Sequence, residues 1–147
     1  MEFRKEFHIL EDDVIRLKIR EKVEGNAREL PFYYYGIYLK SLNKETGKIS
    51  IRIGHNKHSY YNGNIGYEIY PEYRGKKYSL SACKLVMNVA RAHGMTHLFI
   101  TCAEENIASR KIIESLGAEY LETAVPPKDY VYYYEGMPAY RIYKVNL

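Results

Sequence analysis

The hydrophobic pattern of this 147-residue chain is strand-like in the first half and changes its period near residue 78, and this change limits the folds that the chain can adopt. Residues 14–23 alternate strictly between apolar and mostly basic side chains, which is typical of a strand with one face in solvent. Residues 32–42, 47–55 and 65–71 also favour strands, and the segment NKETG would join the first two as a hairpin. Residues 78–93 then place apolar side chains at helical spacing. The chain therefore begins with strands and continues into a helix.

The second half of the chain alternates between strand and helix patterns. A short apolar run at 95–103 predicts a central strand. Asn106 is a suitable N-cap for a helix over 107–116. Strands are predicted over 118–125 and 137–145, on either side of a proline-containing loop. This order indicates an α/β (α+β) fold with a mixed, mostly antiparallel sheet and flanking helices.

The length and composition favour one domain, residues 1–147. No apolar run approaches the roughly 20 residues needed to span a bilayer, so we expect no membrane association. The first residues lack the apolar segment of a signal peptide, and the two cysteines, Cys83 and Cys102, fit a reducing compartment. We therefore expect a cytoplasmic protein. The cysteines have no metal-ligand spacing, so we predict no metal site.

A basic glycine turn separates the fourth predicted strand from the first predicted helix. The N-terminus of a helix offers unsatisfied N–H donors and a partial positive charge. Gly75 would let the backbone approach an anion, Arg74, Lys76 and Lys77 would raise the local potential, and Ser79 would add a hydroxyl. The ATP-binding P-loop and the dinucleotide fingerprint are both absent. The turn by itself leaves two interpretations open, a phosphate cradle and a plain surface turn.

Two segments together resemble a known family. The segment IGYEIYPEYRGKKYSLSACKLVM has a strand ending at a proline, a glycine turn and a helix, and TCAEENIASRKIIESLGAEY has a helix between Asn106 and Gly117. Both resemble signatures of the GNAT superfamily of acetyl-CoA-dependent N-acetyltransferases, whose first signature contains Q/R-x-x-G-x-G/A. The resemblance covers about residues 64–120. It implies a GNAT-like central sheet of about seven strands, with a splayed strand pair at the coenzyme site.

The resemblance implies that acetyl-CoA is the cosubstrate. The strand backbone at Ile69 and Tyr70 would bind the pantetheine arm, and the amides of the turn would bind the pyrophosphate. Asn106 would lie beside the arm, although simple helix capping would also explain it, and both roles can coexist. The predicted coenzyme-binding residues are Ile69, Tyr70, Arg74, Gly75, Lys76, Lys77, Tyr78, Ser79, Asn106, Ser109 and Lys111.

Several features depart from the family pattern. Glu72 stands where Gln or Arg is usual, and Lys77 occupies the final Gly/Ala position. Ile113 stands where many members carry the tyrosine that protonates the departing thiolate. The N-terminal region is also short for the pair of early helices that shape the acceptor site. The resemblance therefore assigns neither the acid nor the acceptor.

The expected reaction is direct transfer of the acetyl group from acetyl-CoA to a primary amine. The attacking amine must be neutral, so a carboxylate that removes a proton helps, and the tetrahedral oxyanion needs a backbone donor near the end of the strand. Glu68 is the first candidate base, followed by Glu104 and Glu105, and a solvated surface carboxylate is the alternative for each. Tyr70, a tyrosine from 130–134 or solvent would protonate the thiolate.

Two other classes of function stay open. Lys77 and Ile113 favour a catalytically silent sensor or scaffold that binds acyl-CoA. The third class is nucleic-acid binding, with the tyrosine-rich segments 32–38 and 130–136 as stacking platforms, although tyrosine also suits half-buried strands. The net charge is only +4, the basic residues are spread along the chain and no motif is present, so the sequence disfavours this class. The expected partners are acetyl-CoA and a small-molecule or peptide amine, and a homodimer is possible.

Overall fold

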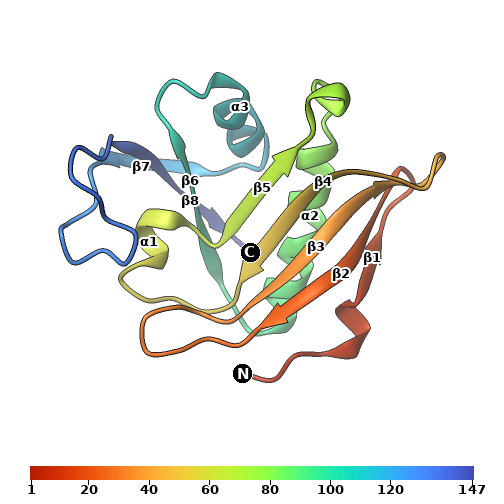
Figure 1. Ribbon diagram of the computed structural model, residues 1–147, viewed down its shortest axis with the longest axis horizontal. Coiled ribbons are helices and arrows are strands. Elements are labelled where there is room, and N and C mark those ends of the chain that lie inside the picture. The colour runs from red at the N-terminus through yellow and green to blue at the C-terminus, as the bar shows by residue number, and fades with distance from the viewer.

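The computed structural model covers residues 1–147 and contains two antiparallel sheets (Figure 1). The strands are β1 (Ile9–Glu11), β2 (Ile15–Val23), β3 (Phe32–Leu39), β4 (Lys44–Arg52), β5 (Ile65–Ile69), β6 (His97–Ala103), β7 (Glu119–Ala124) and β8 (Tyr140–Asn146). The larger sheet has the order β1-β2-β3-β4-β5, and the smaller sheet has the order β6-β8-β7. The α-helices are α1 (Ser59–Asn62), α2 (Tyr78–Ala92) and α3 (Ile107–Ser115). None of them is long and apolar enough to cross a bilayer.

The alternating pattern of the strands decides which face of the larger sheet is buried. Ile15 and Leu17 on β2 are fully buried, whereas Arg16 and Lys18 point to the other face and are half-buried. The helix α2 packs its apolar stripe, which includes Val86, against the buried face. In Figure 1, α2 runs along one face of β2–β5, and no helix runs along the opposite face.

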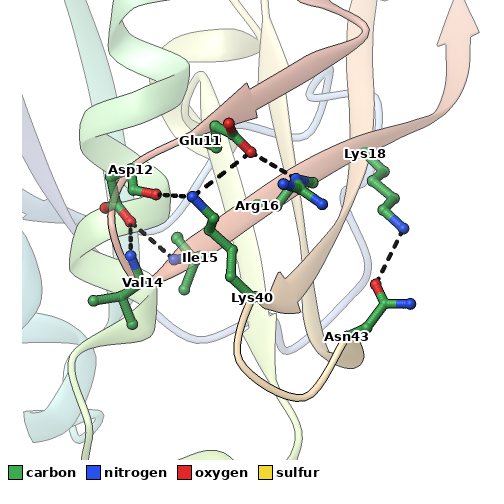
Figure 2. A network of polar contacts seen from close by, with 8 residues as sticks. All are labelled: Glu11, Asp12, Val14, Ile15, Arg16, Lys18, Lys40 and Asn43. Atoms are coloured by element: carbon green, nitrogen blue, oxygen red, sulfur yellow. Dashed lines mark hydrogen bonds and ion pairs between the residues drawn. The ribbon is translucent and has the colours of Figure 1, made fainter.

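Side chains fix the end of the sheet at which β1 turns into β2 (Figure 2). The carboxylate of Asp12 accepts hydrogen bonds from the backbone N–H groups of Val14 and Ile15, both at 2.8 Å. The ammonium of Lys40, which follows β3, donates to the carbonyl of Asp12 at 3.0 Å. The β1–β2 turn and the β3–β4 turn are therefore tied to each other.

Asn64 joins the two sheets where β5 begins. Its backbone N–H donates to the carbonyl of Phe99 on β6 at 2.6 Å, and its Oδ1 accepts from the N–H of Phe99 at 2.9 Å. Its Nδ2 donates to the carbonyls of Arg52 at 3.1 Å and Gly54 at 2.9 Å. Beyond this residue, β5 and β6 are not paired with each other and belong to different sheets. The strands therefore diverge toward their C-terminal ends, as Figure 1 shows.

The fold class predicted from the sequence is confirmed, and the main differences lie in strand number and boundaries. The chain has eight strands in two sheets, where about seven strands in one central sheet were predicted. The short strand β1 carries too little pattern to be recognised, and the division follows from the missing pairing between β5 and β6. As the short N-terminal region suggested, the connection over residues 24–31 contains no helix.

One local prediction was wrong. The segment NKETG is not the hairpin loop, because β4 begins at Lys44. The register shifts opposite Ile37, where Thr46 is accommodated as an extra residue and its Oγ1 donates to the carbonyl of Ile37 at 3.2 Å. The tyrosine-rich segment 130–136 lies, as predicted, in the loop between β7 and β8, where it forms turns, whereas the segment 32–38 is the strand β3. The tyrosine content of a segment therefore does not distinguish a strand from a packed loop.

Candidate active site

A cavity of about 560 Å³ opens between the C-terminal end of β5, the N-terminus of α2 and the helix α3. It brings together the predicted site residues except Tyr70 and Lys76, which do not line it. It also adds Tyr67, Tyr73, Ala108 and Ile112, which were not predicted. The lining residues are Tyr67, Glu68, Ile69, Tyr73, Arg74, Gly75, Lys77, Tyr78, Ser79, Asn106, Ala108, Ser109, Lys111 and Ile112.

One wall of the cavity carries a run of free backbone donors. The N–H groups from Gly75 through Leu80 have no acceptor within the protein, and the first helical bond of this segment is Ser81 N–H to the carbonyl of Lys77 at 3.3 Å. Gly75 has φ 80° and Lys77 has φ 62°, so two left-handed residues shape the turn. Free amides at the N-terminus of a helix favour an anion. The turn therefore has the donors that a phosphate group needs.

Lys77 is the one turn residue whose conformation conflicts with its side chain. Its left-handed φ of 62° costs an L-residue roughly 1–2 kcal/mol, whereas glycine adopts it freely. The structure thus explains why a small residue would suit this position. The side chain of Lys77 is exposed, which leaves its ammonium able to reach an anion at the turn.

The substitution Lys77→Gly is expected to raise the free energy of unfolding by about 1 kcal/mol, because it removes the left-handed strain. Urea unfolding measures this change. Lys76→Gly is the matched control, because Lys76 has no positive φ and its replacement should leave stability unchanged or lower it. A lower unfolding energy for Lys77→Gly would contradict the assignment of strain to this residue.

The free edge of β5 faces the cavity. The N–H of Tyr70 donates to the carbonyl of Thr46 on β4 at 2.8 Å. Because hydrogen-bonding direction alternates along a strand, Tyr67 and Ile69 direct their backbone groups away from β4. The carbonyl of Ile69 accepts a hydrogen bond from the Nε–H of Arg74 at 2.9 Å, whereas the backbone N–H of Ile69 is free. The amide of Ile69, and not that of Tyr70, is therefore open to a ligand.

Tyr67 spans the gap between β5 and α3. Its hydroxyl donates to the Oγ of Ser109 at 3.1 Å. Burial raises the pKa of Tyr67 to about 12, so the hydroxyl keeps its proton at every pH at which the protein would normally be studied. Sequence reasoning missed this residue, although the two-residue period of the strand already placed it on the same side as Ile69.

The helix α3 forms the opposite wall of the cavity. The Oδ1 of Asn106 accepts the N–H of Ser109 at 3.1 Å, so the predicted N-cap is confirmed. Ser109 and Lys111 also line the cavity. Ile113 is fully buried in the core and does not reach the cavity. The position of the usual family tyrosine therefore supplies no proton donor here.

The candidate acids and bases differ in how close they lie to the cavity. Glu68 is exposed, lines the cavity and lies opposite Lys48 in the register of β4 and β5. Glu104 and Glu105 are exposed in the segment between β6 and α3 and do not line the cavity. None of the tyrosines in 130–134 lines it either. Glu68 is thus the predicted carboxylate that the fold brings to the cavity.

The histidines have structural environments. His58 is buried, and its Nδ1 accepts the N–H of Val131 at 3.1 Å. His55 stacks on His97 with ring centroids 4.3 Å apart. No group of three or more histidine, cysteine or acidic side chains is arranged to hold a metal ion.

Known proteins with a similar sequence indicate which family this chain belongs to. The sequence matches the family described as the acetyltransferase (GNAT) domain over residues 3–119. The chain belongs to the GNAT acetyltransferase family. No curated protein matches the chain. The family supports acetyl transfer as the general activity, with acetyl-CoA as the acetyl donor.

Solved structures share the GNAT fold with this chain at low sequence identity. A proposed ribosomal-protein-serine acetyltransferase from Vibrio cholerae is 16% identical, with a TM-score of 0.68 over 95% of this chain and 97% of that one. The ribosomal-protein-S5-alanine acetyltransferase from Vibrio fischeri is 20% identical, with a TM-score of 0.61 over 78% and 61%. The Microcin C7 self immunity acetyltransferase, solved with acetyl-CoA and AMP, is 18% identical, with a TM-score of 0.61 over 79% and 61%.

Proposed function

We propose that this GNAT protein transfers the acetyl group of acetyl-CoA to a primary amine, with the 560 Å³ cavity as the coenzyme site. The observation that carries the proposal is the run of free amides from Gly75 through Leu80 on the wall of that cavity. A surface turn without a ligand would expose such donors to solvent, but it would not need a cavity beside diverging strands.

The residues present fit the chemical groups of coenzyme A. The free amides and the cations Arg74, Lys76 and Lys77 suit a pyrophosphate. The free edge of β5, at Tyr67 and Ile69, suits the amide groups of the pantetheine arm, because an extended chain can pair with an open strand edge. Acetyl-CoA would supply an activated thioester at the inner end of this path.

The same residues can take the roles that acetyl transfer requires. Glu68 would accept a proton from the acceptor ammonium, directly or through water, so that the neutral amine attacks the thioester carbon. The free N–H of Ile69 would stabilise the oxyanion. A carbon–nitrogen bond then forms, the carbon–sulfur bond breaks, the thiolate takes a proton, and the nitrogen of the new amide releases its surplus proton to solvent. Tyr67 is a half-buried tyrosine of the cavity whose hydroxyl can donate this proton in place of a side chain at Ile113.

The substitution Tyr67→Phe is expected to lower kcat at least tenfold, because removing a positioned proton donor raises the barrier for thiolate departure. The KM for acetyl-CoA should change less than threefold, since the ring stays in place. Steady-state release of free thiol measures both. Ser109→Ala is the matched control: it removes only the partner of the Tyr67 hydroxyl and should have the smaller effect. An unchanged kcat in Tyr67→Phe would exclude Tyr67 as the donor.

Two measurements test the proposed function. Calorimetric titration with acetyl-CoA should show saturable binding, and no binding at millimolar ligand would overturn the proposal. Release of free thiol over a panel of amines should depend on the acceptor, which would exclude a silent acyl-CoA sensor. The panel should include polyamines and peptides that begin with serine or alanine, because two structural neighbours are described as ribosomal-protein serine and alanine acetyltransferases.

A further inference from the structure

The face of β2–β5 that points away from α2, here called the open face, combines aromatic and basic side chains. Its centre is β3, on which Phe32, Tyr34 and Tyr38 alternate with core residues and share this face. All three rings are half-buried and are covered by no helix. Phe32 and Tyr34 are two strand positions apart, about 6.8 Å at the usual rise. The rings therefore form a ridge along the middle strand.

Basic side chains lie on both sides of this ridge. Lys18 on β2 has its Nζ 4.4 Å from the ring centre of Tyr38, and Arg52 on β4 has its guanidinium carbon 5.8 Å from that of Phe32. Lys18 on β2 and Lys48 on β4 both lie opposite Gly36 of β3, one on each side of it. Residues from distant parts of the sequence thus meet on one surface.

Carboxylates pair with Arg16 and Arg20 but not with the two central lysines of this face, and Glu21, which lies opposite Tyr34 in the register of β2 and β3, adds a negative charge at its edge. Arg20 is paired with Glu45. Arg16 is paired with Glu11 at 2.6 Å, as Figure 2 shows. Lys18 makes no ion pair, and its nearest polar partner is the Oδ1 of Asn43 at 3.5 Å (Figure 2). Lys48 makes no ion pair either, although Glu68 lies opposite it in the register. The two lysines beside Gly36 are therefore free to bind an anionic partner.

We propose that the open face binds single-stranded nucleic acid. Phosphates would contact the free lysines on either side, and bases would stack on the ridge of Phe32, Tyr34 and Tyr38. An acidic protein segment would use the lysines but would leave the row of rings without a role, so the observations favour nucleic acid. The sequence disfavoured this class because the cations are spread along the chain, but the fold brings Lys18, Lys48 and Arg52 together on one face.

Fluorescence anisotropy with a labelled 12-nucleotide RNA tests the proposal without acetyl-CoA, so its outcome is independent of acetyl transfer. Binding should be saturable and should weaken with salt, with a slope of about −0.7 for each phosphate contacted. The double variant Lys18→Glu/Lys48→Glu should bind at least tenfold more weakly. Tyr34→Leu, which keeps apolar contact but removes the π-face, should weaken binding about fivefold or more.

The matched control is Lys84→Glu/Arg91→Glu, which makes the same charge change on the exposed side of α2. It should alter the affinity less than threefold. Equal weakening by both double variants would overturn the proposal, because binding would then depend on net charge alone. So would absence of binding at 0.1 mM protein and low salt. A variant Tyr34→Leu with unchanged affinity, together with displacement of the RNA by polyglutamate, would identify the face as a site for acidic protein segments.

Discussion

Replacing Ser79 by Asp is expected to weaken acetyl-CoA binding at least 100-fold without unfolding the protein. Ser79 is buried in the first turn of α2 and lines the cavity, so its replacement places a carboxylate beside the proposed pyrophosphate. Two like charges about 4 Å apart repel by about 4 kcal/mol near a protein surface, and each 1.4 kcal/mol changes the affinity about tenfold. A carboxylate at a helix N-terminus is otherwise favourable, so α2 should stay intact. Calorimetry measures the affinity, and urea unfolding checks the fold.

Ser81→Asp is the matched control for this prediction. It adds the same charge to the same turn of α2, but Ser81 does not line the cavity. Because its side chain points away from the cavity and is partly exposed, solvent and salt should screen the added charge, so the affinity should change less than threefold. Equal losses in both variants would mean that the pyrophosphate does not lie at Ser79. Unchanged acetyl-CoA affinity in Ser79→Asp would show that the coenzyme does not bind at the glycine turn.

Replacing Asn64 by Ala is expected to lower the free energy of unfolding by about 3–4 kcal/mol. The side chain makes three hydrogen bonds within the protein, to the backbone of Arg52, Gly54 and Phe99. Their loss leaves backbone groups without partners where the two sheets meet, and each such bond contributes about 1 kcal/mol or more. Urea unfolding at constant m-value measures the change. Acetyl-CoA binding should also weaken, because Asn64 fixes the start of the gap between β5 and β6.

Asn62→Ala is the matched control for Asn64. Asn62 is a nearby residue of the same type in α1, but its side chain makes no hydrogen bond, and its Oδ1 is buried without a partner. Its removal should change stability by less than about 1 kcal/mol. Similar losses in the two variants would show that the size of the side chain, and not the hydrogen bonds of Asn64, holds the sheets together.

The parts of the fold that could be predicted are those that depend on neighbouring residues. The helices α2 and α3 have apolar stripes with local start and stop signals, including Asn106 as the N-cap of α3, so their ends were predicted within one residue. The hairpin of β3 and β4 was predicted, but its loop was misplaced. The bulge at Thr46 depends on how the strands pair, and a sequence pattern does not record that pairing.

The candidate site also has features that could be predicted from local sequence and features that could not. The turn around Gly75 was recognised from the sequence because a glycine and a helix N-terminus orient their own amides. Tyr70 was predicted as a site residue and Tyr67 was not. The choice between them depends on which edge of β5 pairs with β4, and the sequence does not show this. In the proposed mechanism, Tyr67 takes the role expected of a tyrosine at Ile113, because it lies far away in the chain but reaches Ser109 across the gap.

The sequence by itself determined the class of fold, the GNAT family signatures and the glycine turn, because periodicity, caps and turns act over a few residues. Only the tertiary structure decided that β5 and β6 separate after Asn64, that the free edge of β5 presents Tyr67 and Ile69, and that scattered lysines and aromatic rings share one open face. These features depend on pairing between residues that are far apart in the sequence. The spacing of such residues along the chain does not reveal which of them the sheets bring together.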